Sequence, residues 1–347
     1  MDVKRRKFGL LSDGSKVYLY TVSNGQVEFS ATNYGCVITS LIVPSKDRGF
    51  QDIVLAPPTF DFLVSSYACF GAFVGRYAGR IGGASFKLNG IEYVLDKNLK
   101  GSCLHGGFFR WDKQLWNSEI IENSQGKGIR FFRTSPDGEQ GMPGNLEVEV
   151  SYMLNTSNEL IIHYGALSDK DTPINFTNHS YFNLKGQGNG TVENHILQMN
   201  CSSYLETDDC QVPTGKILPV EKSVFDFRIG KSMGEDLSSS ELTATGGYDH
   251  CFCINEDFKY SIPFATVFEP ETKRTMTVAT DMPAVQFYTA NGMGKTIGKN
   301  GSIYFDHGGF CLETQFFPDS PNKPNFPNCI LKSGQRFSST TIYGFKW

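Results

Sequence analysis

Short runs in which apolar and polar residues alternate recur along almost the whole chain, and turn signals close most of them. Alternation with a period of two is typical of strands that bury one face. The pattern predicts strands at 17–22, 37–43, 129–134, 146–154, 160–167, 266–269, 274–280, 284–289, 310–317 and 338–345. Helical periodicity is confined to two short segments, 60–66 and 232–237.

One hairpin is predicted in detail. Asn89 and Gly90 separate the runs 86–88 and 91–95. This dipeptide accepts the positive φ angles of a two-residue type I′ turn, which favours a tight antiparallel pair. The polar segment 155–158, between two alternating runs, predicts a second turn of the same general kind.

Many short strands and few helices predict an all-β fold, a large antiparallel β-sandwich or a barrel rather than a βαβ fold. The glycine-rich segment 186–190 lacks the spacing of a dinucleotide-binding loop, and no amphipathic helix follows it. It is therefore read as a connection. No proline-rich tract, charge block or repeat separates two halves, so we expect one domain over residues 1–347.

Composition and charge exclude several classes of protein. Lys and Arg total 32 against 36 Asp and Glu, a net charge of −4, which argues against nucleic-acid binding. No apolar run approaches the roughly 18 residues of a membrane span, and the first residues do not resemble a secretory leader. Nine scattered cysteines without CxxC pairs are typical of reduced thiols. We expect a cytoplasmic protein.

Two of the six histidines have unusual surroundings. His105 precedes two glycines, which let the backbone turn sharply and leave the imidazole accessible. His179 lies in a segment rich in hydrogen-bonding side chains and aromatic rings, 177–184, which suits a polyhydroxylated ligand. The alternative is that each imidazole only satisfies a buried backbone carbonyl.

Two carboxylates stand in apolar strands. Alternation in 310–317 puts Glu313 on the same face as Cys311 and Gln315. A carboxylate buried there is costly unless it is hydrogen-bonded, so Glu313 is either a structural anchor or a base in a cleft. Asp249 raises the same choice.

Two further interpretations concern ions. A metal could be held by the cluster Asp249, His250, Cys251 and Cys253, but alternation directs His250 away from the others, which argues against it. Arg76 and Arg80 lie four apart in a glycine-rich segment and would share a face, so an anion-binding loop is possible. No GxxxxGK[ST] motif accompanies them, so nucleotide binding is not expected.

Taken together, the chain resembles the galactose mutarotase (aldose 1-epimerase) family. The matching segments keep a consistent order over nearly the whole length: 33–35, 75–81, 104–107, 177–184, 248–250, 286–291 and 312–319. The resemblance implies a single β-sandwich of the galactose mutarotase type, a free aldose such as galactose or glucose as substrate, and no cofactor or metal. We expect a monomer or a weak homodimer.

The resemblance also implies the roles of site residues. Glu313 corresponds to the general base and His179 to the general acid of anomer interconversion. The sugar-binding groups correspond to Arg80, His105, Asp249 and Gln286. With ordinary pKa values, near 4.3 and 6.5, Glu313 would be ionised at pH 7 and His179 mostly neutral. A neighbouring carboxylate would help the imidazole to hold and donate its proton.

The sequence departs from the family pattern at two positions and leaves three other functions open. Gly79 stands where many members have Asn, which removes a polar sugar contact, and Phe316 stands where many have His, which changes the residue beside the general base. The alternatives are an epimerase for a hexose 6-phosphate, which would need extra cations, a sugar-binding protein without activity, and a glycoside hydrolase that uses Glu313 and Asp249.

Overall fold

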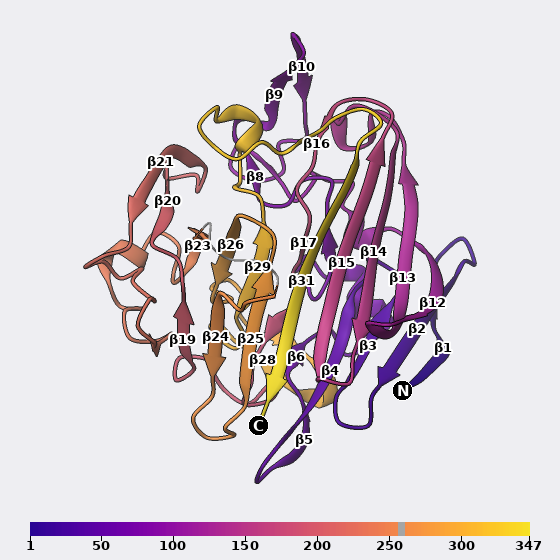
Figure 1. Ribbon diagram of the computed structural model, residues 1–347, viewed down its shortest axis with the longest axis vertical. Helices are drawn as coiled ribbons and strands as arrows, with labels where there is room; N and C mark the ends of the chain where they lie inside the picture. The colour runs from indigo at the N-terminus through magenta and orange to yellow at the C-terminus, as the bar shows by residue number, and fades with distance from the viewer. Residues whose placement is uncertain (256–260) are drawn as a thin grey trace.

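The computed structural model describes residues 1–255 and 261–347, and antiparallel sheets make up most of it (Figure 1). The N-terminal sheet has the strand order β1-β2-β3-β4-β5. Its strands are β1 (Asp2–Leu10), β2 (Lys16–Ser23), β3 (Glu28–Thr32), β4 (Ile38–Ser45) and β5 (Gly49–Asp52).

The largest sheet has nine strands in the order β12-β13-β14-β15-β31-β25-β24-β19-β22. Its strands are β12 (Asn117–Asn123), β13 (Gly126–Ser135), β14 (Leu146–Leu154), β15 (Glu159–Ser168), β19 (Ile196–Met199), β22 (Lys231–Ser232), β24 (Ala265–Phe268), β25 (Thr275–Thr280) and β31 (Arg336–Lys346). The C-terminal strand β31 pairs with β15 on one side and β25 on the other. The last segment of the chain therefore joins the two halves of this sheet.

A third sheet carries three of the six candidate site residues, Asp249, Gln286 and Glu313. Its order is β21-β20-β23-β26-β29. Its strands are β20 (Ser203–Thr207), β21 (Pro213–Pro219), β23 (Asp249–Cys253), β26 (Ala284–Tyr288) and β29 (Cys311–Gln315). In this sheet Gln286 of β26 lies directly opposite Glu313 of β29.

Short two-stranded ladders pair other segments of the chain, and one of them lies against β29 of the third sheet through Thr177 and Asn178. The ladders are β6 (Val54–Leu55) with β18 (Tyr181–Phe182), β7 (Phe73–Val74) with β17 (Thr177–Asn178), β8 (Arg80–Ile81) with β11 (Cys103–Leu104), β9 (Ser85–Leu88) with β10 (Ile91–Val94), β16 (Thr172–Pro173) with β30 (Ile330–Leu331), and β27 (Thr296–Ile297) with β28 (Ile303–Tyr304). Phe182 also forms a bridge to Phe310, so the segment after His179 lies beside the start of β29.

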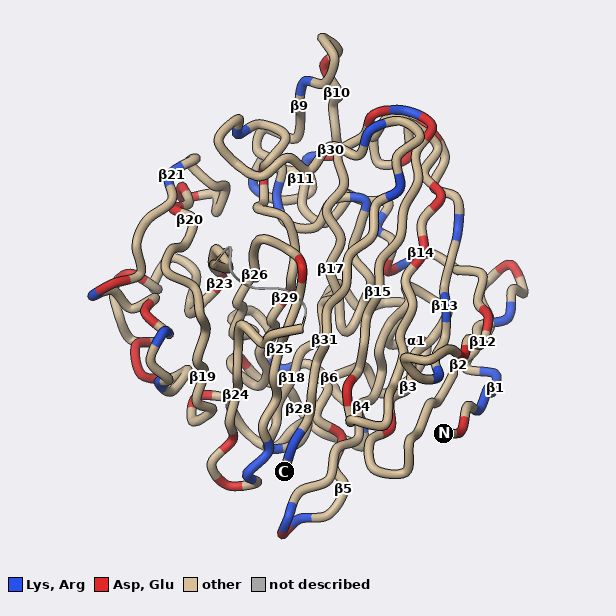
Figure 2. The backbone as a smooth tube through the Cα atoms, viewed as in Figure 1, with Lys and Arg blue, Asp and Glu red and all other residues tan. Residues whose placement is uncertain are grey.

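One hydrophobic core connects the three large sheets. Its largest cluster includes Phe29 from the N-terminal sheet, Tyr152 and Tyr343 from the nine-stranded sheet, and Phe252 and Leu312 from the third sheet. Burial of apolar surface on this scale is the main stabilising contribution to such a fold. Charged residues of both signs lie mostly around the periphery, and the central strands carry few of them (Figure 2).

The sequence-based strands are confirmed. Each of the ten ranges overlaps an observed strand, and 146–154 coincides with β14. In the hairpin of β9 and β10, Leu88 pairs with Ile91, and Asn89 and Gly90 have φ angles of 51° and 81°. This is the predicted turn. The helix predicted at 60–66 is α1 (Phe60–Ser65), capped by the Thr59 side chain.

The helix predicted at 232–237 is wrong. Residues 231–232 form β22, and turns follow. The backbone N–H groups of Met233 and Gly234 donate to the carbonyls of His195 and Glu193, 2.9 and 2.8 Å away. Gly234 also packs so closely on Glu193 that a Cβ atom would lie 2.7 Å from its Cβ. Tertiary hydrogen bonds have replaced the helical ones. Within the described residues, no helix is long and apolar enough to cross a membrane.

Candidate active site

A cavity of about 240 Å³ opens over the third sheet. The sequence-predicted residues Arg80, His105, His179, Asp249, Gln286 and Glu313 all line it. They come from β8, β23, β26 and β29 and from the residues that follow β11 and β17. Residues from sequence positions more than 230 apart therefore share one cavity.

Glu313 lies in the middle of β29 and is 3% exposed. Strand alternation puts Glu313 and Gln315 in the cavity wall, while Leu312 belongs to the core and the Thr314 hydroxyl pairs with that of Thr341. The predicted division of this strand into two faces is confirmed.

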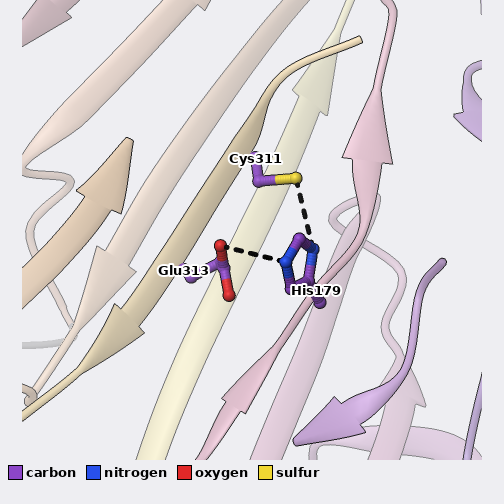
Figure 3. A group of neighbouring side chains, drawn as sticks. All are labelled: His179, Cys311 and Glu313. Atoms are coloured by element: carbon purple, nitrogen blue, oxygen red, sulfur yellow. Dashed lines mark hydrogen bonds and ion pairs between the residues drawn. The ribbon is translucent and has the colours of Figure 1, made fainter. Parts of the chain in front are cut away.

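The imidazole of His179 is held between two side chains of β29 (Figure 3). Its Nε2 lies 3.6 Å from Glu313 Oε1, and its Nδ1 lies 3.5 Å from the Cys311 sulfur. The ring stacks on Tyr181, with centroids 4.9 Å apart. The backbone is fixed as well, because His179 N–H donates to Ala72 O at 2.9 Å and its carbonyl accepts from Gly71 N–H at 2.8 Å.

Burial, more than mutual attraction, determines the protonation of this pair. It raises the pKa of Glu313 well above its usual value, and the nearby Asp249 charge adds to the effect. Burial also lowers the pKa of His179 to about 4. The sequence-based expectation of ordinary pKa values is therefore wrong for this pair, because both charged forms lose their hydration.

The two shifts have a common consequence for the number of protons. A protonated carboxyl beside a neutral imidazole has the same number of protons as a carboxylate beside an imidazolium. Either form contains the one transferable proton that a base and an acid acting together require. Transfer between them converts the neutral pair into the charged pair without a proton from solvent.

His105 is fixed as a single tautomer. Its Nδ1 accepts a hydrogen bond from the Gly79 backbone N–H at 3.2 Å, and burial lowers the pKa of the imidazole well below its usual value. A neutral imidazole that accepts at Nδ1 carries its proton on Nε2. His105 thus presents one N–H donor, next to His179, whose ring centroid is 5.5 Å away.

Arg80, Asp249 and Gln286 form a connected polar group. The Asp249 carboxylate accepts from Gln286 Nε2 at 2.7 Å and from Gln211 Nε2 at 2.8 Å. Arg80 donates to Gln211 Oε1 at 2.8 Å, and its guanidinium lies 3.6 Å from Asp249. Gln211, in the turn between β20 and β21, therefore connects the arginine to the carboxylate.

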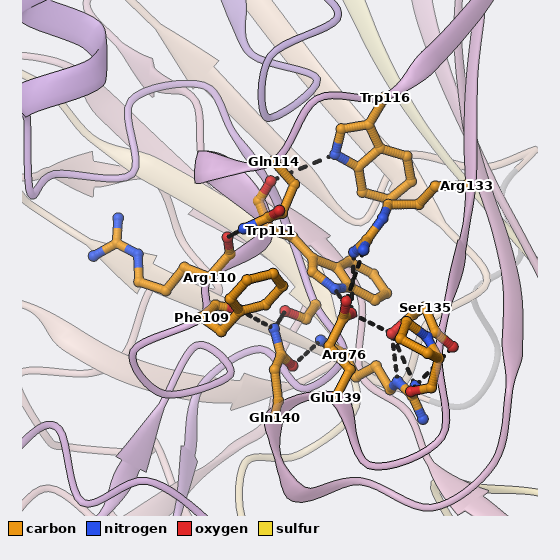
Figure 4. A network of polar contacts seen from close by, with 12 residues as sticks. Arg76, Phe109, Arg110, Trp111, Gln114, Trp116, Arg133, Ser135, Glu139 and Gln140 are labelled. Carbon is orange, nitrogen blue, oxygen red and sulfur yellow. Dashed lines mark hydrogen bonds and ion pairs between the residues drawn. The ribbon is translucent and has the colours of Figure 1, made fainter. Parts of the chain in front are cut away.

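Arg76 does not line the cavity, and Figure 4 shows it within a network of polar contacts. It is fully buried and donates to the side chain and carbonyl of Ser135 and to the carbonyls of Pro136 and Pro143. Arg80 points into the cavity instead. The idea that the two arginines share one face and form an anion-binding loop is therefore wrong. Arg76 connects loops, and Glu139 of the same network binds Trp111, Arg133 and Ser135.

The possible metal cluster in β23 does not assemble. His250 packs against Phe225 with the two rings tilted by 57° and their centroids 4.7 Å apart, on the face opposite Asp249. Among the described residues, the side chains close enough to share an ion are His179, Cys311 and Glu313. His179 faces Cys311 with one nitrogen and Glu313 with the other, so neither nitrogen is directed at a point between all three. The imidazole therefore lies between the thiol and the carboxyl group.

Several cavity residues were not found from the sequence. They are Tyr67, Arg110, Tyr181, Gln211 and Gln315. Gln315 had a detectable signal, because it shares the alternating face of Glu313. Arg110 and Gln211 had none, since they belong to loops that reach the site only through tertiary contacts. Arg110 is held by Asp112 through two hydrogen bonds of 2.7 and 2.6 Å.

Comparison with known proteins gives matches over the whole chain. A profile of the family described as aldose 1-epimerase matches residues 18–344. Galactose mutarotase of Mus musculus is 40% identical over 347 residues, 99% of each chain. Aldose 1-epimerase of Haemophilus influenzae is 37% identical over 341 residues, 96% of this chain and 97% of its own. The crystal structure of galactose 1-epimerase from Lactobacillus acidophilus has a TM-score of 0.88 at 26% identity, covering 99% of this chain and 98% of that one.

Proposed function

The chain belongs to the aldose 1-epimerase family and is an isomerase of that type, and from this premise we propose that Glu313 and His179 are its acid–base pair. The substrate is a free aldohexose such as galactose or glucose. Arg80, His105, Asp249 and Gln286 bind it. No cofactor takes part.

One observation carries the assignment of the pair. Glu313 Oε1 and His179 Nε2 lie 3.6 Å apart in the wall of one cavity. Anomer interconversion needs one proton removed from the C1 hydroxyl and one delivered to the ring oxygen. Both oxygens are bonded to C1, so the base and the acid must be near neighbours. This spacing supports the pair.

The reaction then follows from the single shared proton. Glu313 as carboxylate takes the C1 hydroxyl proton, and His179 as imidazolium protonates the ring oxygen. The bond between C1 and the ring oxygen breaks, leaving an aldehyde at C1 and a hydroxyl at C5. Rotation about the C1–C2 bond presents the other face of the aldehyde. Both proton transfers then run in reverse and close the ring as the other anomer.

The remaining groups hold the sugar while its end rotates. His105 donates from Nε2, and the pKa shift toward the neutral form keeps this donor uncharged. Asp249 and Gln286 offer acceptors, and Arg80 offers donors. Fixed hydrogen bonds that orient the substrate lower the barrier because less orientational entropy is lost during reaction.

The alternative substrates and activities receive less support. The arginines in the described part of the cavity wall, Arg80 and Arg110, are both engaged by acidic residues of the protein, directly or through Gln211. To bind either arginine, the phosphate of a hexose 6-phosphate would have to displace the residue that the arginine now contacts. For a glycoside hydrolase, Asp249 would act as the second carboxylate, but two glutamine amides already bind its oxygens. A protein that only binds sugar has no need of a paired carboxyl and imidazole.

Variants of the pair test the proposal. Polarimetry that starts from α-galactose or α-glucose should show a decrease in kcat of about 10²- to 10⁴-fold for Glu313→Gln, with an unchanged circular dichroism spectrum. His179→Gln should lower kcat by a similar factor while KM changes little. A wild-type rate in Glu313→Gln would contradict the base assignment. A loss confined to KM in His179→Gln would make this residue a sugar contact only.

We also infer a reducing compartment, such as the cytoplasm, as the place of work. All nine cysteines are free thiols, and seven of them are buried. Buried, unpaired cysteines are typical of proteins kept in reducing surroundings. As for assembly, the complete acid–base pair lies within one chain, which supports function as a monomer or a weak homodimer.

A further inference from the structure

Three polar atoms in the cavity wall have no partner in the protein. They are Arg80 Nε, Gln286 Oε1 and Gln315 Nε2, and they account for half of the six buried side-chain atoms without a hydrogen bond in the described part of the chain. Buried polar atoms are almost always paired in folded proteins. Three unpaired atoms around one cavity indicate that its ligand supplies the partners, both donors and acceptors.

Gln315 is the member of this set that the sequence reading did not place in the site. It ends β29 and is 1% exposed. Its side chain lies near Gly79, and both residues line the cavity. A Cβ atom built on Gly79 would lie 3.8 Å from Gln315 Nε2. Because Gly79 has no side chain, no group at this position pairs with the amide, and the Pro318 ring, 3.1 Å from such a Cβ, offers no hydrogen-bond partner either.

The position of Gln315 along β29 determines which part of the sugar it addresses. Glu313 and Gln315 are two residues apart on one face, a separation of roughly 7 Å along a strand. Glu313 acts at C1 under the proposed function. An amide this far along the strand therefore reaches a hydroxyl on the part of the ring remote from C1.

We propose that Gln315 is a further sugar-binding residue, whose Nε2–H donates to a ring hydroxyl remote from the anomeric carbon and so contributes to the choice of aldose. This rests on the proposed function of the cavity. The contact does not change when the ring opens at C1, so it stabilises the bound sugar and the transition state alike. Loss of such a contact raises KM and leaves kcat unchanged.

The experiment combines Gln315→Met with deoxy sugars. Methionine has a similar length but no donor. We expect KM for galactose to rise about tenfold with kcat within about twofold of wild type. Galactose derivatives lacking the hydroxyl at C2, C3, C4 or C6 are then compared. For the derivative that lacks the hydroxyl contacted by Gln315, wild type and Gln315→Met should have the same KM, because neither protein can form this contact. The others should keep the tenfold difference.

A matched control lies on the same strand. Thr314→Val removes the hydroxyl that pairs with Thr341 on the opposite face of β29, outside the cavity. It should lower the melting temperature and leave KM for every deoxy sugar as in the wild type. If Gln315→Met does not fold, Gln315→Asn, whose amide is one methylene shorter, replaces it.

The possible outcomes separate this inference from the proposed function. Equal KM values for wild type and Gln315→Met, or the same ratio for every deoxy sugar, would overturn the role of Gln315. If Glu313→Gln is inactive at the same time, the proposed function stands. A wild-type protein that equilibrates no aldose would overturn both.

Discussion

Among single residues, Glu313 shows most clearly how burial in the fold changes the pKa of a side chain. A carboxyl group in water is ionised at neutral pH, but at 3% exposure in β29 it lacks the hydration that stabilises its charge. Its pKa is raised for this reason, while the pKa of His179 falls to about 4. Both shifts favour the uncharged form of the group, and holding Glu313 in its charged form has a cost to the stability of the fold.

This cost gives a prediction for Glu313→Gln. The unfolded carboxyl releases its proton near its ordinary pKa of 4.5, but the folded one keeps it up to a higher pH. Between these two values the unfolded state binds fewer protons, so the contribution of Glu313 to stability decreases as pH rises. Glutamine has no such dependence. We expect the melting temperature of the variant, relative to wild type, to increase between pH 5 and 8 by about 2 °C.

Calorimetry across this pH range checks the expectation. Glu92→Gln, in the exposed hairpin strand β10, is the control and should follow the wild-type curve at every pH. A Glu313→Gln difference that stays constant or decreases with pH would contradict the raised pKa. His179 acts in the opposite direction, because its lowered pKa makes the unfolded chain bind more protons between pH 4 and 6.5, so that stability rises with pH there.

At the scale of elements, local pattern predicted those strands that bury one face. The bounds predicted for β14 coincide with the observed ones, and the predicted range 338–345 lies within β31. β1 was missed because its residues are mostly charged and exposed, so it shows no apolar face. β21 was also not predicted. It begins and ends with proline, a residue that is rare inside sheets, but it lies at the edge of its sheet, where a missing backbone N–H costs little stability. The helix predicted at 232–237 is absent for a related reason, because long-range hydrogen bonds determine the conformation of this segment.

The candidate site also contains some residues that the local sequence pattern predicts and others that it does not. The face of β29 could be derived from alternation, and this included Gln315. The roles of His179 and Arg80 came from the resemblance and not from their spacing. Gln211 could not be predicted at all, because the turn between β20 and β21 meets Arg80 and Asp249 only after the sheets have packed.

The turn that carries Gln211 provides a second prediction. Its amide connects Arg80 to Asp249 and keeps the guanidinium 3.6 Å from the carboxylate. In Gln211→Leu the two charges can form a direct ion pair, and fewer of their hydrogen-bonding groups remain for the sugar. We expect KM to rise about fivefold with kcat nearly unchanged. Initial rates by polarimetry give both constants.

Asp209→Asn is the matched control for this turn. Asp209 is exposed and lies two residues from Gln211. Its substitution changes the charge of the turn without touching the connected polar group, so KM should stay at the wild-type value. A Gln211→Leu enzyme with unchanged KM would show that the amide does not position the sugar-binding pair.

For the whole molecule, the cavity and the core require both halves of the chain. Arg80 and His105 come from the first third, and Glu313 lies near the C-terminus. β31 joins strands of both halves in the nine-stranded sheet, and the main core cluster runs from Tyr20 to Phe345. These features support the expectation of a single domain over the full length.

A single domain should unfold in one cooperative step that the substrate shifts as a whole. Because sugar binds only the folded state, galactose at about 100 times its dissociation constant adds about 2.7 kcal/mol to the free energy of unfolding. For a chain of this length the melting temperature should then rise by about 4 °C. Differential scanning calorimetry with and without galactose measures this shift. In the Glu313→Gln variant it can be measured without turnover of the sugar. Two transitions, only one of which moves with the sugar, would divide the chain into separate units and contradict the single-domain expectation.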